Sequence, residues 1–379
     1  MSALHTEARH TQATTPSEEV IEALCAELFS SFRRADHHVK GEQYLRGLLT
    51  ASGRKSIQNI ARSLGDESAA QRLHHFICNA PWSWKLVRRA LARHLADRAR
   101  PEAWVVRRML IPKTGTSSVG VHRRFVPESG RVESGQRAHG LWYAGRELNT
   151  PVDWSLSPGT IRAAPHSLAG RHPITEQLDE GAPLPALPAA PLVWDSPVRD
   201  VAGLLRLLPV ERMQAMVRLT PDAAFRPFTP SGRFSEAVTM SAERILAARQ
   251  APWLSGAEPA PGMRTATARV ALPSAGRAPD GSPVRPGAGA AGQGQGLTLF
   301  AQWPKRQPDA VEFWVATTPC AVATDLHRLT VLAQSVDHDS VRTGAKVGLR
   351  DFEGRSYEGW HRHMTLASAA YAALMLGGV

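Results

Sequence analysis

The chain has 379 residues, of which 43% are hydrophobic, and 45 Lys and Arg stand against 34 Asp and Glu. This composition excludes a wholly disordered or fibrous chain, and the length predicts two or three domains that can each bury a core. The net charge of +11 favours a polyanionic partner such as nucleic acid. Because only six of the basic residues are lysines, the base composition of the gene is an alternative cause of the charge.

The cysteines and the chain ends bound the cellular setting. Cys25, Cys78 and Cys320 lie far apart without C-x-x-C spacing, which supports neither a disulfide framework nor a zinc site and predicts a cytoplasmic protein. The first residues lack the apolar core of a signal peptide. The uncharged C-terminal run, Met364 to Val379, is 16 residues long, and a bilayer span needs roughly 20. The run predicts a buried C-terminal helix and no membrane partner.

Helical patterns dominate residues 15–100, after a tail at 1–14 that we expect to be disordered. Two short apolar faces follow each other between residues 57 and 77, separated by Gly65-Asp66. Basic residues lie on or beside these helices, namely Arg54, Lys55, Arg62 and Arg72. The pattern is typical of a helix-turn-helix DNA-binding domain. An ordinary helical bundle with a solvated basic face is the alternative interpretation.

From Trp104 the hydrophobic period changes from that of helices to that of strands. Residues 103–110, 118–126 and 137–144 predict three successive strands. A buried strand that ends at Asp195, a helix at 201–208 and a strand at 213–219 follow. The order strand, helix, strand predicts at least one parallel pair and therefore an α/β fold.

The second half of the chain is interrupted by a spacer. Residues 255–296 contain nine Gly and six Pro, which predicts an insertion or linker with at most an edge strand at 264–272. The α/β domain would then consist of a first part at 101–254 and a C-terminal part at 297–379. The C-terminal part begins with a predicted hairpin at 297–318 and ends in helices from about 324 to 377.

Few residues are placed where they could carry chemistry. Asp195 stands at the carboxyl end of a buried strand, which is a common position for a metal ligand and also for a helix N-cap or a turn. The pairs His37-His38, His74-His75 and His361/His363 lack the i, i+4 spacing of a two-histidine metal site, so we expect them at the surface or at helix ends. Lys113 lies near a glycine but outside any phosphate-binding loop pattern.

Three segments carry a family resemblance. They are VVRRMLIPKTGTSSVGVHRRFV from Val105, PVDWSL from Pro151 and GLRDFEGRSYEGWHRHM from Gly348. Together they resemble the Asp-Asp-Glu (DDE) transposases of insertion sequences, in particular the insertion-sequence 701-like branch. The resemblance implies an RNase H-like mixed sheet with flanking helices, preceded by a small all-helical domain. It also implies DNA as the partner, Mg²⁺ or Mn²⁺ as the cofactor of an active enzyme, and assembly into a homo-oligomer.

The acid set implied by the resemblance is only partly present. Asp195 matches the second acid, Asp337 stands near the position of the third, and Arg107 stands where the family has its first acid. In the family, three carboxylates hold two divalent ions that activate water or a 3′-hydroxyl for attack on a phosphodiester. A guanidinium donates no oxygen ligand and keeps its charge. Arg107 therefore predicts impaired metal binding. We also expect Lys113, Arg123 and Arg124 to contact DNA, together with the basic residues of the helical segment.

Three hypotheses follow. In the first, the chain is a DNA-binding protein of DDE ancestry that needs no metal, acting as a regulatory factor or persisting as a decaying copy. In the second, it is an active transposase in which Glu102, Glu133 or Asp153 substitutes for the missing acid, with Mg²⁺ or Mn²⁺ bound by Asp195. In the third, the old cleft performs small-molecule chemistry with Asp195 as general acid or base.

Overall fold

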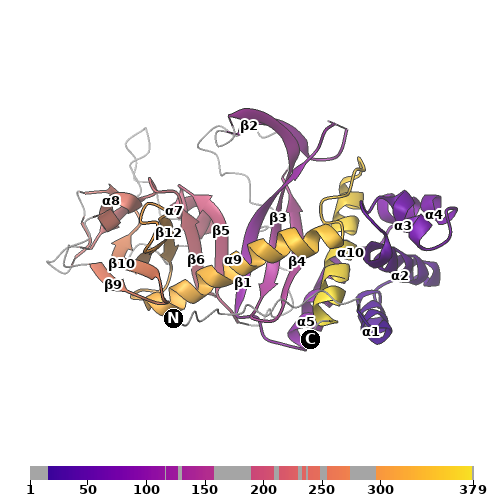
Figure 1. The fold of residues 1–379 in the computed structure, drawn as a ribbon, viewed down its shortest axis with the longest axis horizontal. Coiled ribbons are helices and arrows are strands. Elements are labelled where there is room, and N and C mark those ends of the chain that lie inside the picture. The colour runs from indigo at the N-terminus through magenta and orange to yellow at the C-terminus, as the bar shows by residue number, and fades with distance from the viewer. Residues whose placement is uncertain are drawn as a thin grey trace, which may run out of the picture. The chain divides into compact units, whose positions relative to one another are not determined.

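The computed structural model describes residues 16–115, 117–126, 130–157, 189–208, 213–228, 233–235, 238–247, 254–273 and 296–377. The predicted tail at 1–14 lies outside these residues. Contacts divide the described parts of the chain into two compact units (Figure 1). Unit 1 takes its residues from Met1–Arg100, Met109–Gly159 and Val336–Val379, and unit 2 from Pro101–Arg108 and Thr160–Ser335.

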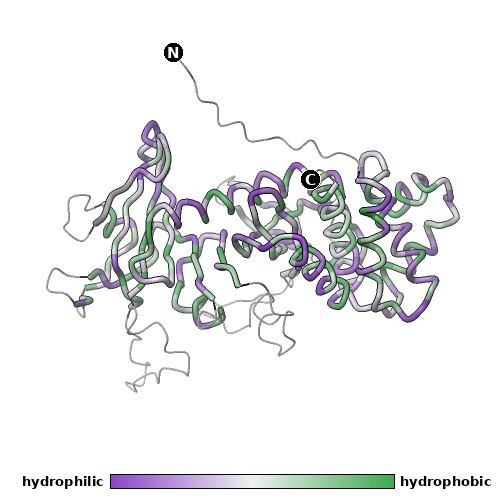
Figure 2. Tube along the Cα trace, turned by 90° about the horizontal axis from the view of Figure 1, so that it is seen from below, coloured by the Kyte–Doolittle hydropathy of each residue, from purple (hydrophilic) through white to green (hydrophobic). Residues whose placement is uncertain are grey.

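Unit 1 is built around a buried helix. Its helices are α1 (Glu18–Leu28), α2 (Ala35–Thr50), α3 (Ile57–Ser63), α4 (Ala69–Cys78), α5 (Trp84–Ala96), the end of α9 (Ala323–Lys346) and α10 (Tyr357–Leu376). Helix α10 packs against α1, α2, α4, α5 and β4 (Asn149–Leu156), and every residue from Gly359 to Ala373 is buried. Much of its tube is white to green in Figure 2. The predicted buried C-terminal helix is confirmed.

The helices predicted between residues 57 and 77 are α3 and α4. Leu73, Phe76 and Ile77 of α4 are buried, as the apolar face requires. Gly65, between the two helices, has φ +72°, a left-handed conformation that glycine adopts without strain. Residues 16–100 share one compact unit with β2–β4 and α10.

Three antiparallel strands complete unit 1. They are β2 (Val121–Val126), β3 (Arg131–Ala144) and β4, in the order β2–β3–β4. The first two were predicted. Strand β4 was not, because all eight of its residues are buried and show no alternation, and because Pro151 stands inside it. Helices α10 and α5 both pack against it.

Unit 2 contains a mixed sheet. Its strands are β5 (Leu192–Val198), β6 (Ala215–Leu219), β7 (Ala224–Pro227), β8 (Met240–Ser241), β9 (Leu254–Ala257), β10 (Met263–Ala271), β11 (Leu297–Pro304), β12 (Glu312–Ala316) and the first residues of β1 (Ala103–Pro112). The order is β1–β5–β6–β12–β11–β10–β7–β8, with β9 also on β10. Pairs β1–β5 and β5–β6 are parallel. This confirms the predicted α/β class, with α7 (Val201–Leu207) as the crossover between β5 and β6 and α8 (Ala242–Ala247) after β8.

The Gly- and Pro-rich segment differs from its prediction. Strand β10 pairs with β11 on one side and with β9 and β7 on the other, so it is an interior strand and the predicted edge position is wrong. Its threonines and alanines give a weak hydrophobic signal, whereas its burial depends on partners distant in sequence. The remainder of the predicted spacer, at 274–295, lies outside the described residues. Within the described segments, no helix is both long and apolar enough to cross a membrane.

Candidate functional site

The two residues singled out by the acid motif are neighbours in unit 2. Strand β5 runs parallel to β1, and the register pairs Arg107 directly with Asp195. The Asp195 side chain is 4% exposed and that of Arg107 is 22% exposed. Arg107 Nη1 donates a hydrogen bond to Asp195 Oδ2. The predicted first and second positions of the acid set are thus together, and the pair they form is ionic.

A second arginine, which the sequence did not point to, holds the same carboxylate. Arg218 of β6 lies 3.1 Å from Asp195 Oδ1 through Nη1, and 3.1 Å from Glu312 Oε1 through Nη2. Its guanidinium also lies 5.7 Å from the ring centre of Trp314, a cation–π contact. An arginine in the buried strand AMVRL was a usable signal, since a buried charge needs a partner.

The polar contacts continue to helix α9. Gln302 Nε2 donates to Glu312 Oε2 at 2.7 Å. Its Oε1 accepts from Thr330 Oγ1 at 3.0 Å and from His327 Nδ1 at 2.9 Å. A chain of hydrogen bonds therefore runs from β1 through β5, β6, β12 and β11 to α9. We call the residues Arg107, Asp195, Arg218, Glu312 and Gln302 the polar ladder.

The electrostatics of Asp195 are those of a structural ion pair. Burial raises its pKa, whereas Arg107 and Arg218 act in the opposite direction and Glu312 raises it further. Both carboxylate oxygens accept from guanidinium groups. The two guanidinium charges would repel a divalent ion that approached either oxygen.

The substitute acids also have interaction partners. Glu102 accepts from Arg328 Nη1 at 2.8 Å in unit 2. Asp153 accepts from Arg88 Nη1 at 2.5 Å in unit 1. Glu133 lies in β3, in register with Arg124 of β2. Glu102 and Asp153 would have to leave these arginines before they could join the rearranged acid set of the second hypothesis.

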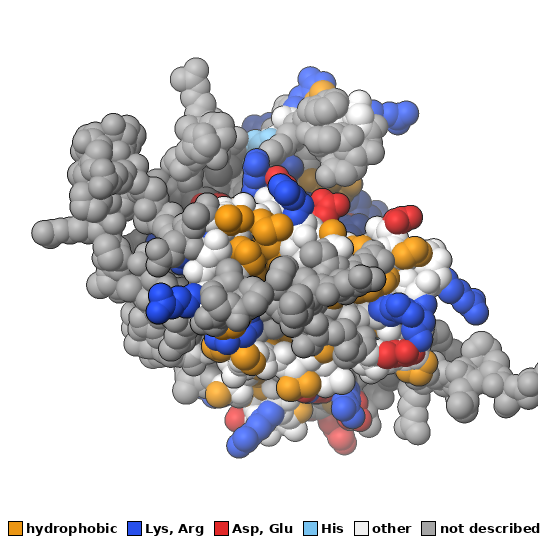
Figure 3. Space-filling model, turned by 90° about the vertical axis from the view of Figure 1, so that its left-hand side faces the viewer, with side chains coloured by type: hydrophobic (Ala, Val, Ile, Leu, Met, Phe, Trp, Pro, Cys, Tyr) orange, Lys and Arg blue, Asp and Glu red, His pale blue; other side chains and the backbone are white. Residues whose placement is uncertain are grey.

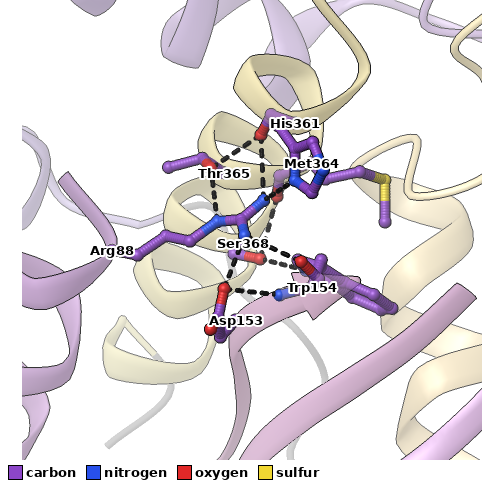
Figure 4. A network of polar contacts seen from close by, with 7 residues as sticks. All are labelled: Arg88, Asp153, Trp154, His361, Met364, Thr365 and Ser368. Atoms are coloured by element: carbon purple, nitrogen blue, oxygen red, sulfur yellow. Dashed lines mark hydrogen bonds and ion pairs between the residues drawn. The ribbon is translucent and has the colours of Figure 1, made fainter. Parts of the chain in front are cut away.

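Arg88 is the centre of a buried network in unit 1 (Figure 4). Its guanidinium donates to Asp153 and to the Trp154 carbonyl at 2.9 Å, to His361 Nδ1 and the His361 carbonyl at 3.1 Å each, and to Thr365 Oγ1 at 2.8 Å. Burial and the Arg88 charge lower the pKa of His361 to about 2. His361 and His363 are buried, so the surface or helix-end position expected for them is wrong. The buried face of α10 holds them.

Asp337, the predicted third acid, lies in the unit 1 part of α9 and is exposed. Asp195 belongs to unit 2. Among the described residues, no group of three or more His, Cys, Asp or Glu side chains is arranged to hold a metal ion. The donor set around Asp195 therefore does not fit a divalent cation.

The residues predicted to contact DNA fall into two groups. Three arginines are exposed and paired with acids: Arg54 with Glu353 at 2.5 Å, Arg62 with Glu67 at 3.7 Å, and Arg72 with Asp66 at 2.5 Å. Arg123 of β2 is exposed, and the side chain of Arg124 lies outside the description.

Lys55 and Lys113 behave differently from these arginines. Both are buried. Lys55 Nζ donates to the Ala51 carbonyl, and Lys113 Nζ donates to the carbonyls of Arg350 and Phe352. Burial lowers the pKa of both lysines. An ammonium group that is buried and bonded to backbone carbonyls is a poor phosphate ligand. Lys55 and Lys113 are therefore not among the side chains that we expect to contact DNA.

Helix α5 carries a basic face that was not among the DNA contacts predicted from the sequence. Lys85, Arg89 and Arg93 recur every four residues on the side of the helix opposite the buried Leu91 and Leu95. The i, i+4, i+8 spacing in WKLVRRALARHLA was visible in the sequence and could have been used. On the face of the molecule seen in Figure 3, by contrast, blue basic side chains are scattered among apolar and acidic ones.

Unit 2 is thus a mixed α/β sheet in which Asp195 lies on β5, the middle one of the three parallel strands β1, β5 and β6, and Arg107 lies beside it on β1. Residues 27–232 match the family described as DDE superfamily endonuclease. The match covers more than half of the 379 residues, and the chain belongs to this superfamily. Membership implies a DNA substrate, and enzymes of the superfamily generally use Mg²⁺ or Mn²⁺. The arginine-bound Asp195 departs from that requirement.

Proposed function

We propose that the chain is a DNA-binding protein of insertion-sequence transposase ancestry, of the 701-like branch, that is impaired in metal-dependent strand cleavage and transfer. Membership of the DDE superfamily supports the ancestry and the DNA partner. The observation that carries the impairment is the engagement of both Asp195 oxygens by Arg107 and Arg218. A carboxylate whose charge is already neutralised by two fixed cations, which would also repel a divalent ion, is a poor ligand for Mg²⁺.

The finer parts of the proposal concern fold and location. We propose an RNase H-like core, supported by the parallel strands β1, β5 and β6 with Asp195 on the central one. We propose that the helices at 15–100 bind DNA, supported by the α3–Gly65–α4 arrangement and its exposed arginines. Cys25, Cys78 and Cys320 form no disulfide, which supports a reducing compartment such as the cytoplasm.

Two sets of side chains are candidates for the phosphate contacts. The first comprises Arg54, Arg62, Arg72, Arg123 and Arg124. Three of these are paired with acids at the surface, and exposed ion pairs are weak enough to exchange an acid for a phosphate. The second is the α5 face of Lys85, Arg89 and Arg93, which carries three positive charges within three helical turns.

DNA binding is tested by fluorescence anisotropy with a labelled duplex oligonucleotide over a range of salt concentrations. We expect log K to fall linearly with log salt, with a slope of about −0.9 for each phosphate neutralised. Arg89→Glu with Arg93→Glu should reduce affinity and make the slope shallower, and so should Arg62→Glu with Arg72→Glu. Arg34→Glu, an exposed arginine outside both sets, is the matched control. A salt response that stays flat up to physiological ionic strength contradicts DNA binding.

Cleavage is tested separately by nicking of a supercoiled plasmid in Mg²⁺ and in Mn²⁺. The wild-type chain should produce no more nicked plasmid than Asp195→Ala does. Nicking by the wild type that needs a divalent ion and disappears in Asp195→Ala would identify an active transposase instead.

A further inference from the structure

The polar ladder alternates in charge across four adjacent strands of unit 2. Arg107 on β1, Asp195 on β5, Arg218 on β6 and Glu312 on β12 follow one another as positive, negative, positive and negative. Their formal charges cancel. Because residues in register project to one face of a sheet, the pairing of Arg107 with Asp195 places the first two members side by side. Trp314, in register with Arg218, shares that face with Glu312 two residues away.

Asp195 depends on both arginines. Its side chain is 4% exposed, and each of its oxygens accepts from a different guanidinium. A carboxylate at this depth needs a compensating positive charge. In an acid-lined nuclease site that compensation comes from bound divalent ions. Here it comes from two covalently attached cations on the strands that flank β5.

Arg218 in turn is shared. It joins Asp195 to Glu312, whose other oxygen accepts from Gln302, and Gln302 is fixed by Thr330 and His327. A change at position 107 would therefore leave Asp195 bound by Arg218. Position 107 alone does not decide whether Asp195 is available to a metal ion.

We propose that Arg107 and Arg218 are the built-in counter-ions of Asp195, so that this face of the sheet folds without a divalent ion, and that returning a carboxylate to position 107 destabilises the protein instead of rebuilding a metal site. The inference concerns folding and metal dependence and does not rest on DNA binding.

The test is the melting temperature of the full chain in EDTA and in MnCl₂, for the wild type, Arg107→Asp and Arg108→Asp. Arg108 is the next residue on β1 and is exposed, so Arg108→Asp makes the same charge change outside the ladder. We expect the wild type to melt at the same temperature in both buffers. Arg107→Asp should melt lower by on the order of 5 °C, Mn²⁺ should not restore it, and Arg108→Asp should stay close to the wild type.

A second comparison covers the case in which Arg107→Asp fails to fold. Arg107→Leu and Asp195→Leu each leave one buried charge with less compensation, whereas the double variant removes both and leaves Arg218 with Glu312. The double variant should melt higher than either single variant. Additive losses in the cycle, a wild type stabilised by Mn²⁺, or an Arg107→Asp variant as stable as Arg108→Asp would each overturn the inference. Metal-dependent plasmid nicking by the wild type would instead refute the proposed function, so the two failures are separable.

Discussion

Unit 1 and unit 2 each contain a buried aspartate held by an arginine, and the two centres differ in how the arginine is bound. Arg88 has a side chain that is 5% exposed, and it donates to five acceptors on β4 and α10. Arg107 is 22% exposed, and its aspartate has a second arginine. In unit 1, one arginine pairs with the aspartate and donates to four further acceptors. In unit 2, two arginines share the neutralisation of Asp195.

The difference teaches that a buried acid is not evidence of a catalytic acid. Asp153 and Asp195 both stand on strands, and both were considered as metal ligands from the sequence. In each case the acceptor oxygens face guanidinium groups. What separates them is the expected cost of removing one arginine, which can be measured.

The largest effect is expected at Arg88. Arg88→Met should lower the free energy of unfolding by about 3–5 kcal/mol, because it leaves Asp153 charged and buried and removes a donor from four other acceptors. Urea denaturation measures the change. Arg89→Met, on the same helix but half-exposed, is the control and should stay within about 0.5 kcal/mol of the wild type. Equal losses of unfolding free energy in the two variants would contradict the expected dependence of this buried network on Arg88.

The Arg88 centre should also respond to acid through His361. The pKa of His361 is about 2 in the folded chain, and the pKa of a histidine in the unfolded chain is about 6.5. Between these two pH values only the unfolded chain binds a proton at this histidine. The stabilising contribution is therefore fully present above pH 6.5, and the free energy of unfolding falls as the pH drops from 6.5 toward 2. At pH 5 the loss is about 2 kcal/mol.

His361→Asn isolates this contribution. It keeps an acceptor near the Nδ1 position that faces Arg88 and removes the titration. The variant should therefore lose about 2 kcal/mol less than the wild type between pH 7 and pH 5 in urea denaturation. Identical pH dependence in wild type and His361→Asn would show that the ring is not excluded from protonation.

A smaller loss is expected at Arg107. Arg107→Ala should reduce the free energy of unfolding by about 1–2 kcal/mol, because the guanidinium is partly solvated and Arg218 still holds Asp195. Arg108→Ala is the neighbouring control in the same urea titrations. A loss as large as that of Arg88→Met would mean that the two centres are equivalent.

The smallest effect is expected at an exposed pair. Arg34 and Asp36 form an ion pair 2.9 Å apart, with side chains 67% and 39% exposed. Solvent screening makes such pairs weak, so Arg34→Ala should leave the melting temperature unchanged within error. A clear decrease in melting temperature would contradict this expectation and would show that the exposed ion pair stabilises the chain despite solvent screening.

Sequence patterns predicted the strands with a run of β-branched, aromatic or other apolar residues and the positions that matched the acid motif. They predicted β1, β5, β6, β11 and β12, although β5 continues to Val198 and Asp195 lies within it instead of at its end. The family resemblance matched Arg107 and Asp195 to the first two acid positions, and only the structure shows that they are paired in register. They missed β4 because a strand buried on both faces has no alternation. They gave β10 an edge position because a strand's neighbours are not encoded in its own residues.

The partners of Asp195 were only half predictable. Arg107 was identified through the motif, but Arg218 and Glu312 meet because β6 lies between β5 and β12, and β12 follows β6 by nearly a hundred residues. Pairing over such a distance depends on the whole sheet. The same holds for His361 and His363, whose burial follows from the helices packed around α10.

The amino-acid sequence by itself determined the charge of the chain, the α/β order of its elements, the superfamily resemblance and the arginine at the first acid position. These follow from local composition, periodicity and motif. Only the tertiary structure decided that the remaining acid is neutralised from both sides and that two lysines expected at DNA are buried. Ion pairs and burial are set by which strands and helices become neighbours, and that choice is made by the packing of the entire fold.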